Sequence, residues 1–183
     1  DWLSPGIGWV ESDTDWDSLA SRLRRRPPVF CRHVCPAQVR IPLERLGTDL
    51  DDLVLAGRLL FPYLDPTRSI SVQTRILGDL CPYGGYDVNT LLSKVFVEQG
   101  VELDVRRPEQ VCSVVITPDQ GFLGMSLAAD NLSDWAGGAR RFKRESGLVS
   151  RAEFKLLEAL ELFGLSLPAG GAALDLGASP GGW

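Results

Sequence analysis

The sequence predicts a mixed α/β protein, on three observations. Residues 69–77 alternate between apolar and other side chains, which is typical of a half-buried strand. Apolar residues follow Asp51 and Asp87 at helical spacing. Two apolar runs, 111–117 and 122–127, are separated by a Pro-Asp-Gln-Gly turn, which predicts a hairpin. With 183 residues, 44% of them hydrophobic and 23% charged, the chain has the composition of one or two globular domains.

Residues 1–48 form the first predicted unit. A short strand is expected at 8–10, and a helix over 18–23 capped by Asp15 or Asp17. The arginines at 24–26 fall at the C-terminal end of that helix, where cations suit the helix dipole, and Pro27-Pro28 ends it. Residues 29–34 and 38–43 are predicted as strands. No chemistry can be assigned to this unit.

Residues 49–135 form the second predicted unit, in the order helix, strand, helix, strand, hairpin. The first helix follows Asp51-Asp52 and ends at Pro62. Asp87 is expected to cap the second helix, which Gly100 follows. Residues 101–105 are predicted as a short strand. This order describes a compact α/β module.

The four cysteines, Cys31, Cys35, Cys81 and Cys112, do not predict a metal site. Alternation over 29–35 would place His33 on the same strand face as Cys31 and Cys35. Two thiols and one imidazole make an incomplete zinc shell, however. Reduced, buried thiols in a cytoplasmic protein are therefore expected. No apolar run approaches 18 residues, so no membrane partner is expected.

Residues 172–183 contain a short apolar run, a carboxylate and a glycine-rich turn. This order is typical of the first strand of a Rossmann-type fold, which is followed by a turn that places a nucleotide-like ligand at a helix N-terminus. The string Asp-Leu-Gly-Ala-Ser-Pro-Gly-Gly-Trp at 175–183 resembles the S-adenosyl-L-methionine motif of FtsJ-like RNA 2′-O-methyltransferases. The resemblance implies that the enzyme uses S-adenosyl-L-methionine. It also implies a Rossmann-like methyltransferase domain that is truncated within its first turn, so the chain alone is expected to be inactive. The cofactor-binding residues it implies are Asp175, Gly177, Ala178, Ser179, Pro180, Gly181, Gly182 and Trp183.

A second string precedes this motif. Ser150 and Glu153 form a capping box that begins a helix, which Gly164 ends. By periodicity Lys155 lies opposite the apolar face, where it could be an ordinary surface lysine paired with Glu158. Residues 150–156 are similar to a Ser-Arg-Ala/Ser-x-x-Lys-Leu string of FtsJ-like enzymes. The resemblance implies that Lys155 is the first lysine of a Lys-Asp-Lys-Glu catalytic tetrad and that Ser150 lies near the cofactor.

A basic segment lies between these parts, although the chain as a whole carries a net charge of −5. Lysine and arginine supply most non-specific affinity for nucleic acids, and aromatic rings stack on unpaired bases. We therefore expect RNA contacts here; the alternative is a solvated linker pinned by its aromatic side chains. The residues concerned are Trp135, Arg140, Arg141, Phe142, Lys143 and Arg144.

Residues 72–75, 83–86, 111–127 and 131–142 resemble a THUMP domain, an RNA-binding module of RNA-modifying enzymes. Together with the FtsJ-like strings, this resembles bacterial ribosomal RNA cytidine 2′-O-methyltransferases. The implied organisation is a ferredoxin-like segment at 1–48, a THUMP domain at 49–135, a basic linker at 136–149 and the start of the methyltransferase at 150–183. Large-subunit ribosomal RNA is the implied partner. A non-catalytic RNA-binding module and a THUMP-containing base methyltransferase remain alternatives, and the oligomeric state is open.

Overall fold

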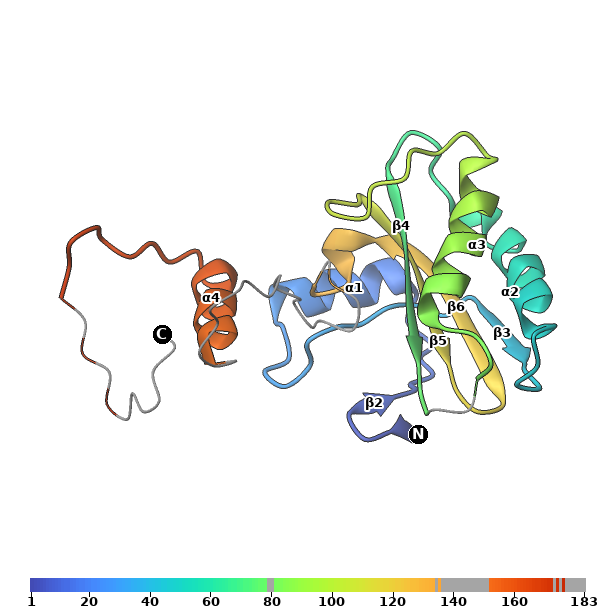
Figure 1. The fold of residues 1–183 in the computed structure, drawn as a ribbon, viewed down its shortest axis with the longest axis horizontal. Coiled ribbons are helices and arrows are strands. Elements are labelled where there is room, and N and C mark those ends of the chain that lie inside the picture. The colour runs from blue at the N-terminus through green and yellow to red at the C-terminus, as the bar shows by residue number, and fades with distance from the viewer. Residues whose placement is uncertain (79–80, 134, 136–151, 173, 175, 177–183) are drawn as a thin grey trace. The chain divides into compact units, whose positions relative to one another are not determined.

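The computed structural model of the chain describes residues 1–78, 81–133, 135, 152–172, 174 and 176. The chain divides into two units, residues 1–139 and 140–183. Strands and helices alternate in the first unit, which confirms the predicted mixed α/β class (Figure 1). Among the described residues, no helix is both long enough and apolar enough to cross a membrane.

The first unit is built on a four-stranded sheet in the order β3-β6-β5-β4. The strands are β3 (Val39–Pro42), β4 (Ile70–Ile76), β5 (Gln110–Ile116) and β6 (Gln120–Leu127). β4 and β5 are parallel, whereas β6 is antiparallel to both β5 and β3. The predicted strand at 69–77 and the predicted hairpin are confirmed. β3 lies before residue 48, so one strand of the sheet comes from residues 1–48, the segment that was predicted as a separate unit.

Two helices pack side by side against one face of this sheet, α2 (Asp49–Arg58) and α3 (Gly85–Val97) (Figure 1). They approach closely at Gly57, where an added Cβ would lie 2.5 Å from Cδ2 of Leu92. Both helices begin earlier than predicted. Asp87 lies inside the first turn of α3, and its carboxylate accepts a hydrogen bond from the Gly84 N–H at 2.8 Å. The largest fully buried side chains of the apolar core are Leu53, Leu60, Ile70, Leu92, Phe96, Ile116 and Leu123.

A buried carboxylate fixes the loop between β3 and α2. Asp49 accepts hydrogen bonds from the backbone N–H groups of Glu44 (3.0 Å) and Arg45 (2.9 Å). It also accepts one from the hydroxyl of Tyr83 at 2.9 Å. This loop needs support because Arg45 adopts a positive φ of 62°, which non-glycine residues rarely do.

The other face of the sheet is crossed by the segment that leads into β3. A Cβ at Gly124 would collide with the backbone carbonyl of Pro36. The Gln38 side chain donates to the Met125 carbonyl and accepts from the Met125 N–H, both at 2.9 Å, as a neighbouring strand would. Trp9 packs on Phe122 with ring centroids 4.9 Å apart.

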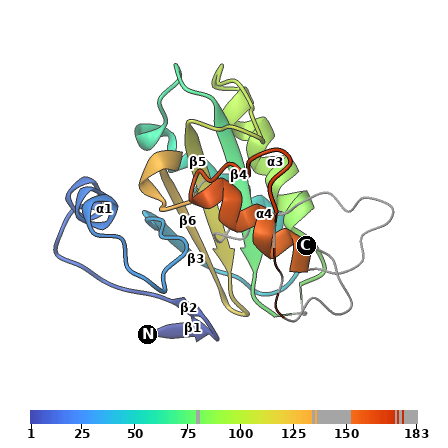
Figure 2. The same cartoon turned by 90° about the vertical axis from the view of Figure 1, so that its left-hand side faces the viewer.

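The predicted N-terminal helix is α1 (Trp16–Arg25), and Asp15 is its cap, since its carboxylate accepts from the Ser18 N–H at 2.9 Å. α1 contacts the short helix η2 (Ala128–Asp130) that follows β6. Arg24 and Asp130 form an ion pair there at 2.9 Å. Figure 2 shows the strands between α1 and α3. The remaining elements of this unit are β1 (Trp2–Ser4), β2 (Ile7–Gly8) and η1 (Phe61–Tyr63).

Two predicted strands are wrong, and the one predicted at 8–10 overlaps β2 only at Gly8. Residues 29–34 form no strand, and Val29 and Phe30 are exposed after the Pro27-Pro28 break. Residues 101–105 contribute only an isolated bridge between Leu103 and Ile70. Asp104 turns the chain there by accepting hydrogen bonds from two following backbone N–H groups at 2.8 and 3.0 Å. Residues 29–34 thus have strand-forming composition without a partner strand, whereas 101–105 pair with β4 at a single residue.

In the second unit the structure describes one helix, α4 (Ala152–Leu162). Its end agrees with the prediction, because Gly164 adopts a positive φ of 60°. The Leu165 N–H then bonds back to the Leu160 carbonyl at 2.8 Å. Phe163 lies beyond the last helical residue and is 68% exposed.

Candidate functional site

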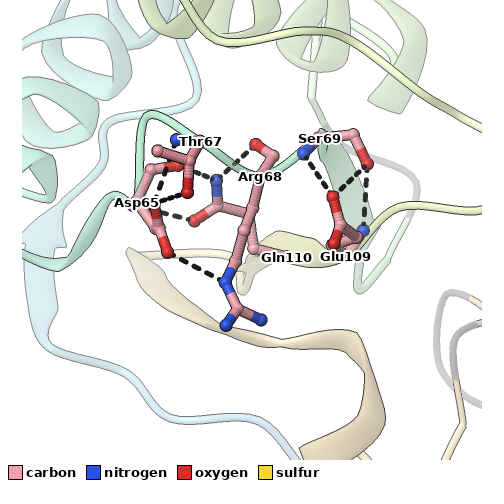
Figure 3. Close-up of polar contacts among 6 residues, drawn as sticks. All are labelled: Asp65, Thr67, Arg68, Ser69, Glu109 and Gln110. Carbon is pink, nitrogen blue, oxygen red and sulfur yellow. Dashed lines mark hydrogen bonds and ion pairs between the residues drawn. The ribbon is translucent and has the colours of Figure 1, made fainter.

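A polar cluster in the first unit lies where β4 and β5 begin (Figure 3). Parallel pairing places Ile70 opposite Gln110 and so brings the loop before β4 against the start of β5. Ser69 and Glu109 hold the two chains together. The Ser69 N–H donates to the Glu109 carboxylate at 3.1 Å, and the Glu109 N–H donates to the Ser69 hydroxyl at 3.2 Å.

Gln110 is the centre of this cluster and is 2% exposed. Its Nε2 donates to the carbonyls of Asp65 (2.7 Å) and Arg68 (2.9 Å). Its Oε1 accepts from the Asp65 N–H at 3.1 Å. Both N–H donors and one acceptor position of the amide are therefore bound to backbone groups, so the side chain positions the loop.

Asp65 is committed in the same way. Its carboxylate accepts from the Thr67 hydroxyl (2.6 Å) and N–H (2.9 Å) and from Arg68 Nε (2.8 Å). The hydrogen bonds from Thr67 hold the pKa of Asp65 below its ordinary value, and the Arg68 charge adds to this. A carboxylate stabilised in its charged form is a poor general base near neutral pH.

A hollow of about 380 Å³ lies beside this cluster, with residues of α1, β5 and β6 in its wall. Three of its four carboxylates are already engaged. Asp15 caps α1, Asp65 binds Thr67 and Arg68, and Asp130 pairs with Arg24. Because Asp17 alone lacks such a contact among the described residues, the hollow offers no acid–base pair of the kind that hydrolytic chemistry needs.

Of the four cysteines that were expected to be buried, only Cys112 is buried, whereas Cys35 and Cys81 are half-buried and Cys31 is exposed, so the expectation is wrong for Cys31. Burial raises the pKa of both Cys35 and Cys112, which keeps these thiols protonated. Burial also lowers the pKa of His33, partly offset by its Nδ1 contact with the Ser133 carbonyl at 3.1 Å. Because 29–34 is not a strand, the alternation that would align His33 with the cysteines does not occur. Within the described residues no three metal-ligating side chains gather.

Two of the predicted site residues lie in the described part of the chain. Lys155 is on the first turns of α4, and its side chain is exposed. Trp135 is half-buried, and its backbone N–H donates to the Ser133 hydroxyl at 3.2 Å. Leu174 and Leu176, which flank the predicted cofactor carboxylate, are exposed.

The other predicted site residues lie outside the described residues. For the cofactor these are Ser150, Asp175, Gly177, Ala178, Ser179, Pro180, Gly181, Gly182 and Trp183. For RNA contacts they are Arg140, Arg141, Phe142, Lys143 and Arg144. Their roles stay predictions.

Comparison with known proteins gives a family for the C-terminal segment and relatives for most of the chain. Residues 148–183 match the FtsJ-like methyltransferase family. The Ribosomal RNA large subunit methyltransferase M of Azotobacter vinelandii (strain DJ / ATCC BAA-1303) is 35% identical over 149 residues, which are 76% of this chain and 39% of that protein. The protein of the same name from Cellvibrio japonicus (strain Ueda107) is 28% identical over 148 residues, 74% of this chain and 42% of that protein. The chain thus spans about two fifths of the length of these relatives.

Three solved structures align with part of this chain. TrmN from Thermus thermophilus is 26% identical with a TM-score of 0.49, over 55% of this chain and 30% of that chain. PH1313 from Pyrococcus horikoshii Ot3 is 11% identical with a TM-score of 0.43, over 51% and 31%. A 4-thiouridine synthetase in an RNA complex with bound ATP is 13% identical with a TM-score of 0.42, over 64% and 29%.

The resemblance predicted from residues 150–156 and 175–183 is thereby confirmed. This mixed α/β chain is similar to the ribosomal RNA large subunit methyltransferases M, and its residues 148–183 match the FtsJ-like methyltransferases.

Proposed function

We propose that this chain is part of a cytoplasmic, S-adenosyl-L-methionine-dependent enzyme that methylates a ribose 2′-oxygen of large-subunit ribosomal RNA. The observation that carries the proposal is the FtsJ-like match at residues 148–183, within a chain whose relatives are ribosomal RNA methyltransferases. In this proposal residues 49–135 are a THUMP domain, and the basic linker at 136–149 helps to hold the RNA.

The donor set at residues 175–183 suits the proposed cofactor. Three glycines permit close backbone approach to a bulky nucleoside, and the Asp175 carboxylate can orient loop amides or, through water, the methionine amine. When bound, the cofactor supplies a methyl group on a positively charged sulfur. Ser150 would lie near it.

Lys155 is the proposed catalytic residue within this sequence. A ribose hydroxyl must lose its proton as its oxygen attacks the methyl carbon, so negative charge develops on that oxygen. An ammonium group that holds the target phosphate and faces this oxygen stabilises the charge. Lys155 is exposed on α4, so its side chain is accessible to such a substrate.

The first unit supports a binding role rather than a chemical one. The carboxylates of Asp49, Asp65 and Asp130 are occupied by hydrogen bonds or ion pairs, and Gln110 is bound to backbone. The proposed enzyme therefore places its chemistry after residue 148. Only Lys155 of the proposed tetrad is matched in this sequence, so we expect the 183-residue chain by itself to transfer no methyl group.

Transfer of a tritiated methyl group tests the proposal. The full-length protein that carries this sequence is incubated with labelled S-adenosyl-L-methionine and unmodified large-subunit ribosomal RNA, and the labelled nucleotide is identified. We expect label on a ribose 2′-oxygen. Lys155→Ala should lower kcat by at least about 100-fold, the range that a lost electrostatic group produces.

Lys94→Ala is the matched control, because Lys94 is also an exposed helical lysine but lies on α3. It should leave kcat unchanged. Label on a base would reject the tetrad assignment and favour a base methyltransferase. Tight RNA binding without any transfer would favour a non-catalytic binding module.

A further inference from the structure

A stretch of sequence without acidic residues begins within α1, directly after Asp17, and continues to Leu43. Between Ser18 and Leu43 there are six arginines and no aspartate, glutamate or lysine, although the whole chain has a net charge of −5. Such segregation of positive charge is the electrostatic signature of an anion-binding surface. The structure decides which of these arginines face outward.

α1 divides its arginines between two roles. Trp16, Leu19, Ala20 and Leu23 recur at helical spacing and are buried or half-buried, so they form the inner side of the helix. Arg24 lies beside this side and pairs with Asp130 at 2.9 Å, which ties α1 to η2.

The outer side of α1 carries Arg22 and Arg25, three residues apart, and Arg26 is the C-cap residue that follows; all three are exposed. None of the three guanidinium groups has a hydrogen bond or an ion pair with any described residue. The helix dipole favours cations in a last turn, but it does not account for three unneutralised charges along one side. We call these three residues the arginine face.

An aromatic side chain follows the arginine face. Pro27 and Pro28 end the helix, and the chain turns back through a hydrogen bond from the Cys31 N–H to the Pro28 carbonyl at 3.4 Å. In this turn Phe30 is 98% exposed. Leaving a phenyl ring in water forgoes hydrophobic stabilisation, so a ring held there is available for an external contact.

We propose that the arginine face binds phosphate groups of RNA and that Phe30 stacks on an unpaired base beside them. Exposed arginines without a partner among the described residues, followed closely in the chain by an exposed aromatic ring, combine the two kinds of contact that proteins make with single-stranded nucleic acid. The inference rests on the proposed function for the identity of the RNA. It adds a surface on the first unit, separate in sequence from the basic linker.

The test is RNA binding by the full-length protein over a range of salt concentrations. The variant Arg22→Gln/Arg25→Gln/Arg26→Gln removes the arginine face and keeps the Arg24–Asp130 pair. Each single-strand phosphate contact contributes about 0.7 to the slope of log K against log salt. Loss of three contacts should lower that slope by about 2 and weaken binding about 100-fold at 0.1 M salt. Phe30→Ala should weaken binding at least about fivefold with little change in slope.

Arg58→Gln/Arg106→Gln/Arg107→Gln is the matched control, because these arginines are also exposed and belong to the same unit. It changes the net charge equally, so we expect less than about a threefold change in binding. Circular dichroism should show that both triple variants keep the fold.

The outcomes separate this inference from the proposed function. If the wild-type protein neither binds nor methylates RNA, the proposed function fails and the inference fails with it. If it does both and the two triple variants bind equally, the inference alone is overturned. The variant without the arginine face could instead retain RNA binding and lose binding to phosphatidylserine vesicles. That result would assign the arginine face to an anionic membrane and would also overturn the inference.

Discussion

Replacing Gln110 by methionine tests whether the cluster in Figure 3 is a scaffold. Methionine has nearly the length and volume of glutamine but cannot make the three hydrogen bonds to residues 65 and 68. Each such bond contributes about 0.5–1.5 kcal/mol net, and a carbonyl left without a partner costs more. We therefore expect the free energy of unfolding to fall by about 2–4 kcal/mol.

Urea denaturation of the 183-residue chain, followed by circular dichroism, measures this change. A loss of that size should lower Tm by about 5–15 °C for a domain of this length. Hydrogen exchange should localise it, because the Asp65 N–H loses its acceptor and should exchange faster. Gln99→Met is the matched control, since Gln99 is exposed just after α3 and should change stability by less than about 0.5 kcal/mol.

A loss below about 0.5 kcal/mol for Gln110→Met would refute this reasoning, because it would mean that water replaces the amide at no cost. A variant with full stability but impaired RNA binding would refute it differently. Gln110 would then contribute to binding rather than to the shape of the loop.

Two further predictions concern other buried contacts. Tyr83→Phe removes the hydrogen bond to Asp49 and should cost about 1–2 kcal/mol in urea denaturation. Burial, together with the neighbouring Asp49, raises the pKa of Tyr83. The contribution of Tyr83 to stability should therefore be complete below the ordinary tyrosine pKa of 10.0 and decline above it. As a control, Tyr86→Phe at an exposed site should alter neither the stability nor its pH dependence. Gly124→Ala should lower the free energy of unfolding by at least about 2 kcal/mol through overpacking. Gly47→Ala is the control, because its added Cβ meets no atom within 4 Å and should leave the stability unchanged in the same assay. Equal effects of the two substitutions would contradict the close approach of the chain to β6 at Gly124.

Elements with a clear local signal were predictable from the sequence. The strand at 70–76 alternates, the hairpin of β5 and β6 has a turn signal, and Asp15 precedes a helical pattern. Strands at 29–34 and 101–105 were not correctly predicted, because composition alone does not supply a partner strand. Pro27-Pro28 and the Asp104 turn oppose extended pairing there.

A candidate site residue could be proposed from the sequence only where the signal is contiguous, and its role stays a prediction. Lys155 follows from a seven-residue string, and its exposure on α4 agrees with the periodicity. The Gln110 cluster has no such string, because its partners lie 42 and 45 residues away and meet it only through parallel pairing of β4 with β5. The acid-free stretch at 18–43 was visible in the sequence, but only the structure separates the paired Arg24 from the outward arginine face.

A net charge of −5 does not oppose RNA binding by this chain, because phosphate groups respond to local charge. At about 0.1 M salt, screening limits the reach of an exposed charge to about 10 Å. The first turn of α2, for example, contains Asp49, Asp51 and Asp52, and α2 packs against β3 and α3 rather than forming part of the arginine face. Because α2 packs beside α3, and strands of the sheet lie between α3 and α1 (Figure 2), we expect the arginine face to act almost independently of these carboxylates. The proposed RNA affinity should accordingly depend on substitutions in the arginine face and scarcely on Asp51→Asn/Asp52→Asn, although both alter the net charge.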